Sequence, residues 1–445
     1  MTKRCSILLI IFIQAWPQLA SAVTYSVFSG QSIQAKIDGA TNGDTVAIFG
    51  GTYTENLTIA NKDVRLQLVA GQTVTLAGNI TFSGLSNAYT FANFTWGGQT
   101  DKNITVSDCR NFTINGINSP AGNITVTGSN TAAKIFATAL TNGTLTVSGG
   151  AKVQGIQSSN TGIAVSGSGT TTDFARCTVT GNVSVASGVS RVSFSRCLVT
   201  EILDSSAGNT YVSYTTLRVF RQRSSGKAYL LGNTINERSV PGIETVHAYE
   251  NSTIIALNNI IRDGYHDDNY QDNWAFYADS AARIIAYNNI VYNYRGRYGD
   301  RAFGFVGSTT NIVSCNIAYQ IQDEFASGPF ANNTVTYNLS QTGESGGVFL
   351  QNRVNADPAF VDTTNFVLGP TSPARNAGDP DPRFNDIDGT RNDMGIYGGP
   401  LYDPEGRTGS KPVVMQVELD QTQFLRGDYS TLKLKAVGSA TGTAP

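Results

Sequence analysis

The chain has 445 residues, of which only 14% are charged, and its formal net charge is −2. A chain so close to neutral lacks the basic patch that a nucleic-acid-binding protein requires, so we expect no nucleic-acid partner. Glycine is frequent, at 46 residues, as are Thr, Ser and Asn. This composition is typical of many short strands joined by tight turns and excludes a mainly helical protein.

The first 22 residues have the pattern of a secretory signal peptide. Lys3 and Arg4 precede an apolar run over 7–13, and the small residues at 20–22 fit a cleavage site. The apolar run is too short to span a bilayer, and no later stretch approaches about 18 consecutive apolar residues. The sequence therefore predicts a secreted or extracellular protein without a membrane span; a bacterial cell surface and the periplasm are the alternative locations.

A short helix is predicted at 31–39. Ile33, Ile37 and Ala40 follow one another at helical spacing, and Gly39 stands near the end. A helix at this place would cover the end of a stack of strands, which otherwise exposes apolar side chains and unpaired backbone groups.

Short strands follow from residue 43 onward. They alternate apolar and polar residues, so one face of each points inward. A Gly or Asn usually precedes each strand, where the chain must turn a corner. The expected strands include 45–48, 51–53, 56–59, 79–81, 103–106, 123–126, 144–147, 162–165 and 182–185.

One position recurs through the middle of the chain at intervals of 17 to 30 residues. A motif that returns about every 20 residues, with insertions between copies, is the signature of a solenoid. Two or three short parallel strands per turn would stack like residues into ladders, and a buried Asn can bind both the next Asn and the backbone of the turn. The expected ladder is Cys177, Cys197, Thr216, Asn233, Asn259, Asn289, Asn316 and Asn333.

Four cysteines follow the predicted signal peptide, and two of them, Cys177 and Cys197, share the ladder position. They should lie on adjacent turns, about 4.8 Å apart. Parallel side chains make poor disulfide geometry. We therefore expect two buried thiols, with a disulfide as the alternative.

Several segments resemble the right-handed parallel β-helix proteins of the pectate-lyase-like superfamily, of the bacterial secreted type. The resemblance covers about residues 23–400 and implies an all-β, right-handed parallel β-helix, but it does not specify a reaction. It is carried by the helix, the Asn ladder and the segments 43–59, 355–362, 371–379, 386–391 and 393–397.

The expected domains are a signal peptide at 1–22, the β-helix with its C-terminal cap at 23–400 and a linker at 401–412 rich in Gly, Pro and charge. Residues 413–445 would begin a second β module or form a tail docked on the helix, since 413–419 and 431–437 alternate like strands.

Candidate functional residues concentrate in two loops, 262–274 and 292–301. Both loops leave the ladder at equivalent points and should therefore lie side by side on one surface. Aromatic rings stack on sugars, and arginine binds a uronate carboxylate with two parallel hydrogen bonds. The expected substrate-binding residues are Tyr265, His266, Tyr270, Trp274, Tyr292, Tyr294, Tyr298 and Arg301.

Two reactions fit these loops. In a lyase, Arg295 or Arg297 would remove the proton next to a uronate carboxylate; the resemblance implies such a base and a Ca²⁺ ion held by aspartates. In a glycosidase, two carboxylates would flank the bond. The catalytic candidates are Asp267, Asp268, Asp272, Arg295 and Arg297; the candidate Ca²⁺ ligands are Asp263, Asp267 and Asp268.

The sequence departs from the superfamily's catalytic motifs, and a solvated polar loop is the alternative for 262–274. The expected function is thus a monomeric, secreted protein that binds an acidic polysaccharide and cleaves it as a lyase or glycosidase. The alternative is a non-catalytic extracellular protein with a glycan-binding, adhesin-like or structural role.

Overall fold

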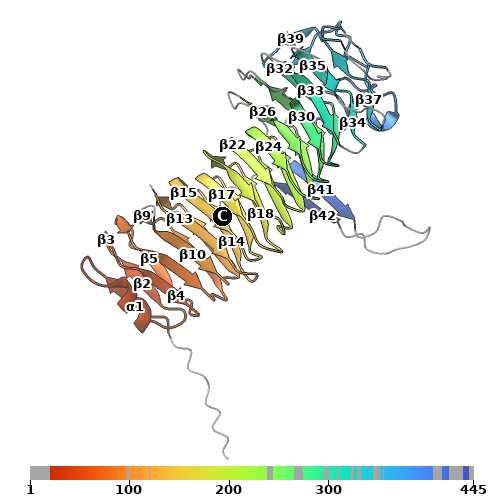
Figure 1. Ribbon diagram of the computed structural model, residues 1–445. Coiled ribbons are helices and arrows are strands. Elements are labelled where there is room, and N and C mark those ends of the chain that lie inside the picture. The colour runs from red at the N-terminus through yellow and green to blue at the C-terminus, as the bar shows by residue number, and fades with distance from the viewer. Residues whose placement is uncertain are drawn as a thin grey trace, which may run out of the picture.

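The structure is a computed structural model, an all-β parallel solenoid of about 13 turns with very little helix. It forms an elongated rod with the N-terminal strands at one end (Figure 1). It describes residues 21–97, 101–119, 121–237, 244–264, 274–294, 300–307, 310–321, 325–327, 332–343, 351–353, 355–403 and, as backbone, 413–419 and 434–439. Most of the predicted signal peptide lies outside these residues, as do residues 404–412 of the linker predicted at 401–412.

The predicted N-terminal helix is confirmed as α1 (Ile33–Gly39). Ser32 begins it by accepting a hydrogen bond from the amide of Ala35 at 3.0 Å, which satisfies one of the free donors of the first turn. Ile33 and Ile37 are fully buried against the first strands. A three-stranded sheet lies beside the helix: β1 (Thr24–Val27), β2 (Thr45–Ile48) and β5 (Arg65–Leu68).

The turns of the solenoid build two long parallel sheets, of 12 and 23 strands. The 12-stranded sheet consists of β8 (Ala88–Ala92), β11 (Asn111–Asn115), β14 (Ala132–Phe136), β16 (Lys152–Ile156), β18 (Thr171–Ala175), β21 (Arg191–Ser195), β23 (Asn209–Ser213), β25 (Lys227–Leu231), β28 (Thr253–Leu257), β31 (Arg283–Tyr287), β34 (Ile312–Ser314) and β37 (Thr334–Thr336).

The 23-stranded sheet takes two segments from most turns. It consists of β3 (Gly51–Tyr53), β4 (Leu57–Ala60), β6 (Val74–Leu76), β7 (Ile80–Ser83), β9 (Thr95–Trp96), β10 (Asn103–Ser107), β12 (Asn118–Ser119), β13 (Asn123–Thr127), β15 (Ala139–Val147), β17 (Ser159–Val165), β19 (Thr178–Val179), β20 (Val183–Val185), β22 (Leu198–Ser205), β24 (Thr216–Gln222), β26 (Thr234–Asn236), β27 (Val246–Ala248), β29 (Ile260–Arg262), β30 (Trp274–Asp279), β32 (Ile290–Tyr294), β33 (Arg301–Val306), β35 (Ile317–Ile321), β36 (Ala326–Ser327) and β38 (Leu339–Ser340).

Inward side chains of the strands form the main core. In β10, for example, Ile104 and Val106 are fully buried while Thr105 between them faces outward. Like residues stack in register on successive turns, as Ile104 does on Ile124. Burial of this continuous apolar column is the main stabilising contribution to the rod.

The predicted ladder lies at the corner after the 12-stranded sheet. The residue before each ladder position has a positive φ, for example 55° at Asn258 and 58° at Asn288, which turns the chain sharply into the next strand. Asn259 and Asn289 are fully buried. The amide of Asn259 donates to Oδ1 of Asn289 at 2.9 Å, so consecutive turns stack as predicted.

The prediction is wrong for two residues of the ladder, Thr216 and Asn333. Thr216 begins β24, and its neighbour Thr215 occupies the ladder, where its Oγ1 accepts from the amide of Cys197. Asn333 stacks instead on Asn311 in a second ladder at another corner. The true ladder continues from Asn316 to Asn338 and Asn352, whose Oδ1 atoms accept from the amide of the preceding member.

The prediction of buried thiols is confirmed, since the four described cysteines are all free and buried. The amide of Cys177 points at Sγ of Cys197, 3.4 Å away. In this part of the ladder, sulfur takes the place of the Asn oxygen.

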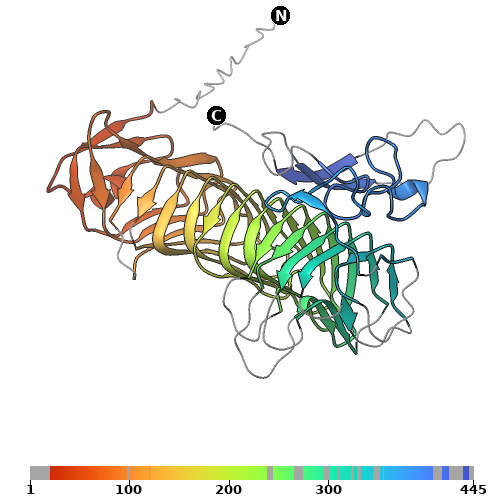
Figure 2. The same cartoon turned by 90° about the horizontal axis from the view of Figure 1, so that it is seen from above.

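The C-terminal segment 355–403 packs along the side of the last turns (Figure 2). It contains β39 (Phe360–Asp362), β40 (Val367–Leu368) and a 3₁₀ turn at Pro382–Phe384. Asn288 Nδ2 donates to Asn392 Oδ1 at 2.9 Å and to the carbonyl of Asp393. A second apolar core forms between the rod and this segment, from Ile260, Ile290, Ile317, Leu339, Phe366, Leu368, Ala374, Ala377, Met394 and Ile396.

Two further strands, β41 (Val413–Leu419) and β42 (Leu434–Ser439), pair as an antiparallel hairpin. The first has the predicted bounds, and the second begins three residues later than predicted. The hairpin lies beside β18 and β23 (Figure 1). Whether it begins a second module stays a prediction.

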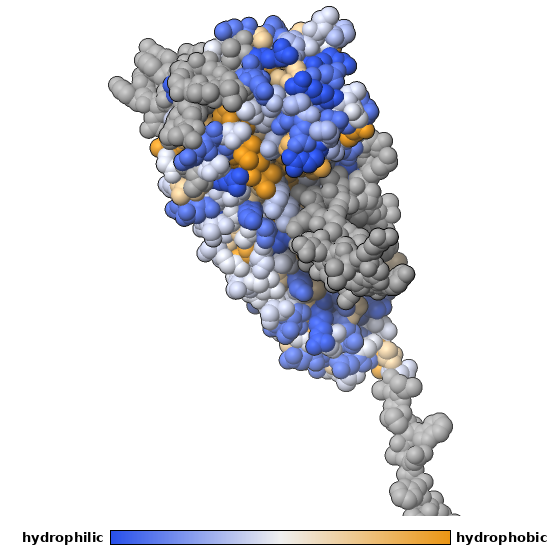
Figure 3. All heavy atoms as spheres, turned by 90° about the vertical axis from the view of Figure 1, so that its right-hand side faces the viewer, coloured by the Kyte–Doolittle hydropathy of each residue, from blue (hydrophilic) through white to orange (hydrophobic). Residues whose placement is uncertain are grey.

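The outward face of the 12-stranded sheet changes character along the rod. One row is polar at first, with Thr90, Thr113 and Lys134, and becomes apolar in the later turns, with Ile255 and Ile285. Figure 3 views the molecule from the right-hand side of Figure 1 and shows a small apolar area within a mostly hydrophilic surface.

Candidate functional site on the outer face of the large sheet

The stems of the predicted functional loops lie on neighbouring turns. Ile261 pairs in register with Val291, and the amide of Asp263 donates to the carbonyl of Tyr292 at 3.0 Å. A third stem lies on the turn before them, where the amide of Thr245 donates to the carbonyl of Trp274 at 3.3 Å. The predicted adjacency is thus confirmed for the loop stems.

Most of the predicted site residues fall on the loops themselves. The following lie outside the described residues: Tyr265, His266, Asp267, Asp268, Tyr270, Asp272, Arg295, Arg297 and Tyr298.

Asp263, a predicted cation ligand, takes part in a local polar network. Its carboxylate accepts from Nε of Arg262 at 2.9 Å and from Nδ2 of Asn293 at 2.8 Å. Among the described residues, no group of three or more His, Cys, Asp or Glu side chains is placed to hold a metal ion.

Two of the predicted tyrosines face away from the surface of the loops. Tyr292 lies against the C-terminal segment, with its ring 5.0 Å from that of Phe366 in an edge-on contact. Tyr294 is fully buried, and its hydroxyl forms a hydrogen bond with the hydroxyl of Thr245. Burial raises its pKa well above the ordinary value. Tyr294 therefore connects the end of β32 with the segment before β27 in the interior of the rod.

Trp274 and Arg301, by contrast, lie at the outer face of the large sheet. They are partners in register on β30 and β33, and both are half-buried. The indole of Trp274 stacks on the ring of Tyr277 at 4.6 Å. A Cβ at Gly304 would lie 2.5 Å from Trp274 Cδ1, so glycine at this position makes room for the indole.

The neighbouring strands bring together a group that we call the His247 cluster: Glu244, His247, Tyr249, Tyr277 and Asp279. Val246 and Ala248 point into the core, so His247 between them points outward. Its Nδ1 lies 3.1 Å from Oε2 of Glu244, and its Nε2 lies 3.1 Å from Oδ2 of Asp279.

Aromatic rings enclose this imidazole. The ring of Tyr249 stacks on it at 3.3 Å, and Tyr277 contacts it edge-on at 4.8 Å. His247 is consequently only 3% exposed, although it lies on the outward face. Tyr249, Tyr277 and Trp274 remain half-buried and continue the aromatic surface to the loop stems.

Arginines border the cluster on the preceding turn. Arg221 pairs in register with His247. Arg223 lies 4.3 Å above the ring of Tyr249 and binds Asp204 through its Nε, at 2.8 and 3.0 Å from the two carboxylate oxygens. The turn therefore places two guanidinium groups beside aromatic rings and carboxylates.

The neighbours of Glu244 stabilise its ionised form. Burial disfavours the ionised form of Glu244, but the hydrogen bond with His247, together with the charges of His247 and Arg221, outweighs burial and lowers the pKa of Glu244. Burial raises the pKa of Tyr249 and of Tyr277, so both hydroxyls stay protonated. Oδ1 of Asp279 is buried and makes no hydrogen bond to the described residues.

This arrangement combines fixed hydrogen-bonding groups with aromatic surface and positive charge. A carboxylate at each ring nitrogen fixes the orientation of the imidazole. The rings present flat apolar surface, and the half-buried arginines can pair with anionic groups.

His247, Glu244 and Asp279 are not among the site residues predicted from the sequence. The signal available was the position of His247 as a polar residue between two core residues, Val246 and Ala248, of a strand. Its partner Asp279 comes 32 residues later, and only the stacking of turns brings the two together.

In the described part of the chain, no helix is both long and apolar enough to cross a membrane. No protein-family model matches the sequence, and neither does any curated protein. Among solved structures, the chain is similar to "Crystal structure of pectate lyase Pel9A", with a TM-score of 0.31 and 12% sequence identity, covering 86% of this chain and 98% of that chain. An identity this low says nothing about the ligand or the reaction.

Proposed function

We propose that the protein binds an acidic, uronate-containing polysaccharide on the outer face of the large sheet, across the His247 cluster. One observation carries this proposal: Arg221, His247 and Tyr277 stand in register on three consecutive turns. Turns of a parallel solenoid are spaced by about 4.8 Å, so these side chains form a continuous strip.

The strip offers both kinds of contact that a uronate polymer needs. The faces of Trp274 and Tyr277 suit the apolar face of a sugar ring. The guanidinium of Arg221 suits the sugar's carboxylate, because it can form two parallel hydrogen bonds. Glu244 and Asp279 can accept from sugar hydroxyls, and the unsatisfied Oδ1 of Asp279 favours such a donor.

A binding panel tests the proposal. Polygalacturonate, alginate and a neutral galactan would be titrated against the protein, with and without Ca²⁺, with affinity followed by calorimetry. We expect the two acidic polymers to bind and the neutral one to bind more weakly. Equal affinity for all three polymers, or no binding, would refute the proposal.

Cleavage of the same polymer is a second candidate function, favoured by the half-buried Tyr277 and Arg221 that stand on either side of His247. In an elimination, a base removes the proton next to the uronate carboxylate and an acid protonates the departing sugar oxygen. The half-buried hydroxyl of Tyr277 would supply that proton, His247 would hold the two carboxylates in place, and Arg221 would stabilise the charge that develops on the uronate. The candidate base residues Arg295 and Arg297 stay part of this proposal.

The products of cleavage distinguish a lyase from a glycosidase. Unsaturated sugars, detected by their ultraviolet absorbance, indicate a lyase, and new reducing ends without unsaturation indicate a glycosidase. Binding without either product would leave a non-catalytic glycan-binding or adhesin-like protein. Secretion and a monomeric state complete the proposal; size-exclusion chromatography and cell fractionation test them.

A further inference from the structure

A row of basic residues runs along the outward face of the 12-stranded sheet, away from the His247 cluster. The pairing of β16, β18, β21, β23, β25, β28 and β31 places one residue of each strand in line along the rod. In chain order this row reads Lys152, Thr171, Arg191, Asn209, Lys227, Thr253 and Arg283.

Cations therefore occupy every second turn, with a neutral polar residue between them. Two turns of a parallel stack span about 9.6 Å. Lys152 and Lys227 are exposed, while Arg191 and Arg283 are half-buried. We call this row the cation row.

The face around the cation row has a surplus of positive charge. The adjacent outward row adds Lys134 and one carboxylate, Asp173, which pairs with Arg191 at 2.6 Å. The protein as a whole has a formal net charge of −2, so the positive charge of this face is a local feature. A basic strip attracts an anionic polymer over distances of about a Debye length, near 10 Å at moderate salt.

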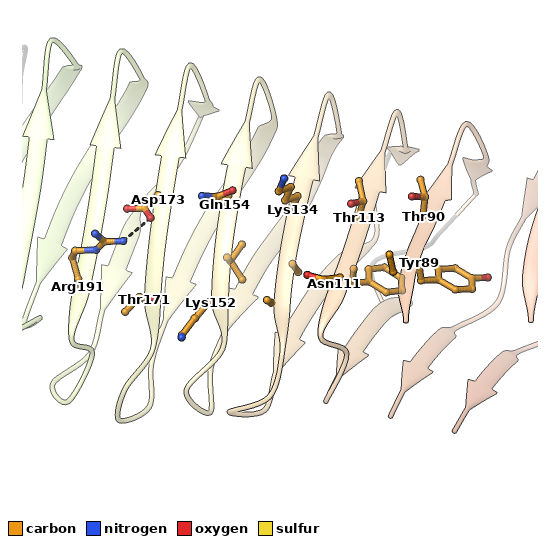
Figure 4. A pocket seen from close by; sticks show the side chains of 15 residues that line it. Tyr89, Thr90, Asn111, Thr113, Lys134, Lys152, Gln154, Thr171, Asp173 and Arg191 are labelled. Carbon is orange, nitrogen blue, oxygen red and sulfur yellow. Dashed lines mark hydrogen bonds and ion pairs between the residues drawn. The ribbon is translucent and has the colours of Figure 1, made fainter. Parts of the chain in front are cut away.

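The N-terminal part of the cation row lies in a groove of about 580 Å³. Figure 4 shows its lining in two parallel rows, with Thr113, Lys134 and Gln154 in one and Lys152 and Arg191 in the other. The lining is rich in hydroxyl, amide and amino groups, and the groove follows the axis of the rod from β8 to β21. Such a groove suits a linear ligand lying parallel to that axis.

The hairpin of β41 and β42 contacts β18 and β23, and the outward residues Ser193 and Tyr211 are buried there. Arg191 and Asn209 stay half-buried, so the cation row runs along the edge of the covered area.

We infer that the cation row is a second binding track, which holds a linear acidic polysaccharide along the rod. In an extended polyuronate, alternate sugars turn their carboxylates to the same side, so a carboxylate would meet a cation about every second turn, except at Arg191, which already pairs with Asp173. The neutral residues between the cations would face the sugar hydroxyls. This inference does not rest on the His247 cluster, which lies on the other sheet.

A polysaccharide fits this track better than a nucleic acid. The row carries single cations separated by neutral residues, whereas a nucleic acid has phosphates at closer intervals and is bound by denser basic patches with stacking aromatics. The described part of the row itself has no aromatic residue, and Tyr211, which stacks on Tyr229 in the adjacent outward row, is only 2% exposed.

The test neutralises the two exposed lysines in a Lys152→Gln/Lys227→Gln variant. The matched control is Lys36→Gln/Lys102→Gln, which removes the same charge from half-buried lysines outside the track. Binding of polygalacturonate would be measured at two salt concentrations. We expect roughly three- to tenfold weaker binding and a smaller salt dependence for the track variant, with the control close to the wild type.

Each result supports or overturns the track. Galacturonate oligomers long enough to span several turns should bind more tightly to the wild type than short ones, and this length dependence should shrink in the track variant. Unchanged affinity in the track variant, or tighter binding of single-stranded DNA than of polygalacturonate, overturns the inference. If a Tyr277→Ala variant loses binding while the track variant keeps it, only the proposal for the His247 cluster survives; the reverse leaves only the track.

Discussion

Oδ1 of Asn289 accepts two hydrogen bonds from Asn259 on the preceding turn, one from the backbone amide and one from Nδ2, each 2.9 Å long. An Asn289→Ala substitution would leave this buried amide and the carbonyl of Ala256 without their partner. We expect a loss of about 2–4 kcal/mol in stability, measured as a shift of the urea midpoint. An Asn118→Ala substitution at an exposed strand position should change stability by less than about 0.5 kcal/mol. Equal midpoints for the two variants would contradict a stabilising role of the ladder.

The contact between the rod and the C-terminal segment can be tested at Phe366, which is fully buried against Tyr292 and Phe360. A Phe366→Ala substitution should cost about 3–5 kcal/mol, because it opens a cavity in the second core. Val367 beside it is 38% exposed, so Val367→Ala is the matched control and should have little effect. Limited proteolysis would measure the effect, since a loosened segment is cut faster. Equal cleavage rates would show that the segment does not depend on this core.

The cysteines should stay unreactive in the folded protein. Burial raises the pKa of the Cys315 thiol to about 11 and also raises the pKa of Cys197. The hydrogen bond with Cys197 lowers the pKa of Cys177 to about 7, but this thiol is 1% exposed, so the reagent cannot reach it. We expect Ellman's reagent to detect almost no thiol before unfolding and four thiols per mature chain in denaturant without reductant. Only two thiols in denaturant would mean that Cys177 and Cys197 form the alternative disulfide.

The C-terminal segment should respond to pH through Asp386. Burial raises the pKa of its carboxyl to about 6, although the amides of Gly399 and Asp393 donate to it. The folded state thus holds this proton more tightly than the unfolded state does. The protonated Asp386 stabilises the folded state fully below about pH 4, and this contribution is lost as the pH rises through about 6. The free energy of unfolding should fall by about 1 kcal/mol over this range, after a discount for solvent screening.

An Asp386→Asn variant should therefore show a flatter stability profile between pH 4 and 6, measured by thermal melting. Asp388→Asn is the control, because the pKa of Asp388 is lowered by its hydrogen bonds with Thr390 and so does not titrate in this window. If the melting temperature of the Asp386→Asn variant changes with pH as that of the wild type does, Asp386 is not the cause of the pH response.

The His247 cluster is tested at Tyr277, whose ring contacts both His247 and Trp274. Tyr277→Ala should weaken binding of an acidic polysaccharide about tenfold, because it removes the central stacking surface. Tyr25→Ala, a half-buried tyrosine at the N-terminal end of the rod, serves as the control. Calorimetric titration with polygalacturonate compares the two variants. If Tyr25→Ala weakens binding as much, the loss is a general effect on folding.

The fold could be predicted from the sequence because a solenoid repeats its local pattern at every turn. The buried position of Asn259 over Asn289 followed from a short motif and its spacing. The failures at Thr216 and Asn333 have one physical cause. Turns differ in length, so the spacing does not define the register to one residue, and a second Asn ladder at another corner resembles the first.

The candidate site was less predictable. The density of charged and aromatic residues in the sequence predicted a site at residues 262–274. The His247 cluster instead depends on side chains from distant positions in the sequence, which only the stacking of turns brings together. The lateral position of the segment 355–403 was also hidden, because its short irregular stretches have no periodic pattern.

The corner that carries the ladder keeps the same form in every turn, with one left-handed residue followed by one inward polar or sulfur-bearing residue from Ser158 to Asn352. Changes in length are taken up elsewhere, chiefly between β26 and β27, β29 and β30, and β32 and β33. New peptide could therefore be grafted at that edge without disturbing the backbone that holds the rod together. A single scaffold of this kind can alter what it displays while leaving its own architecture intact.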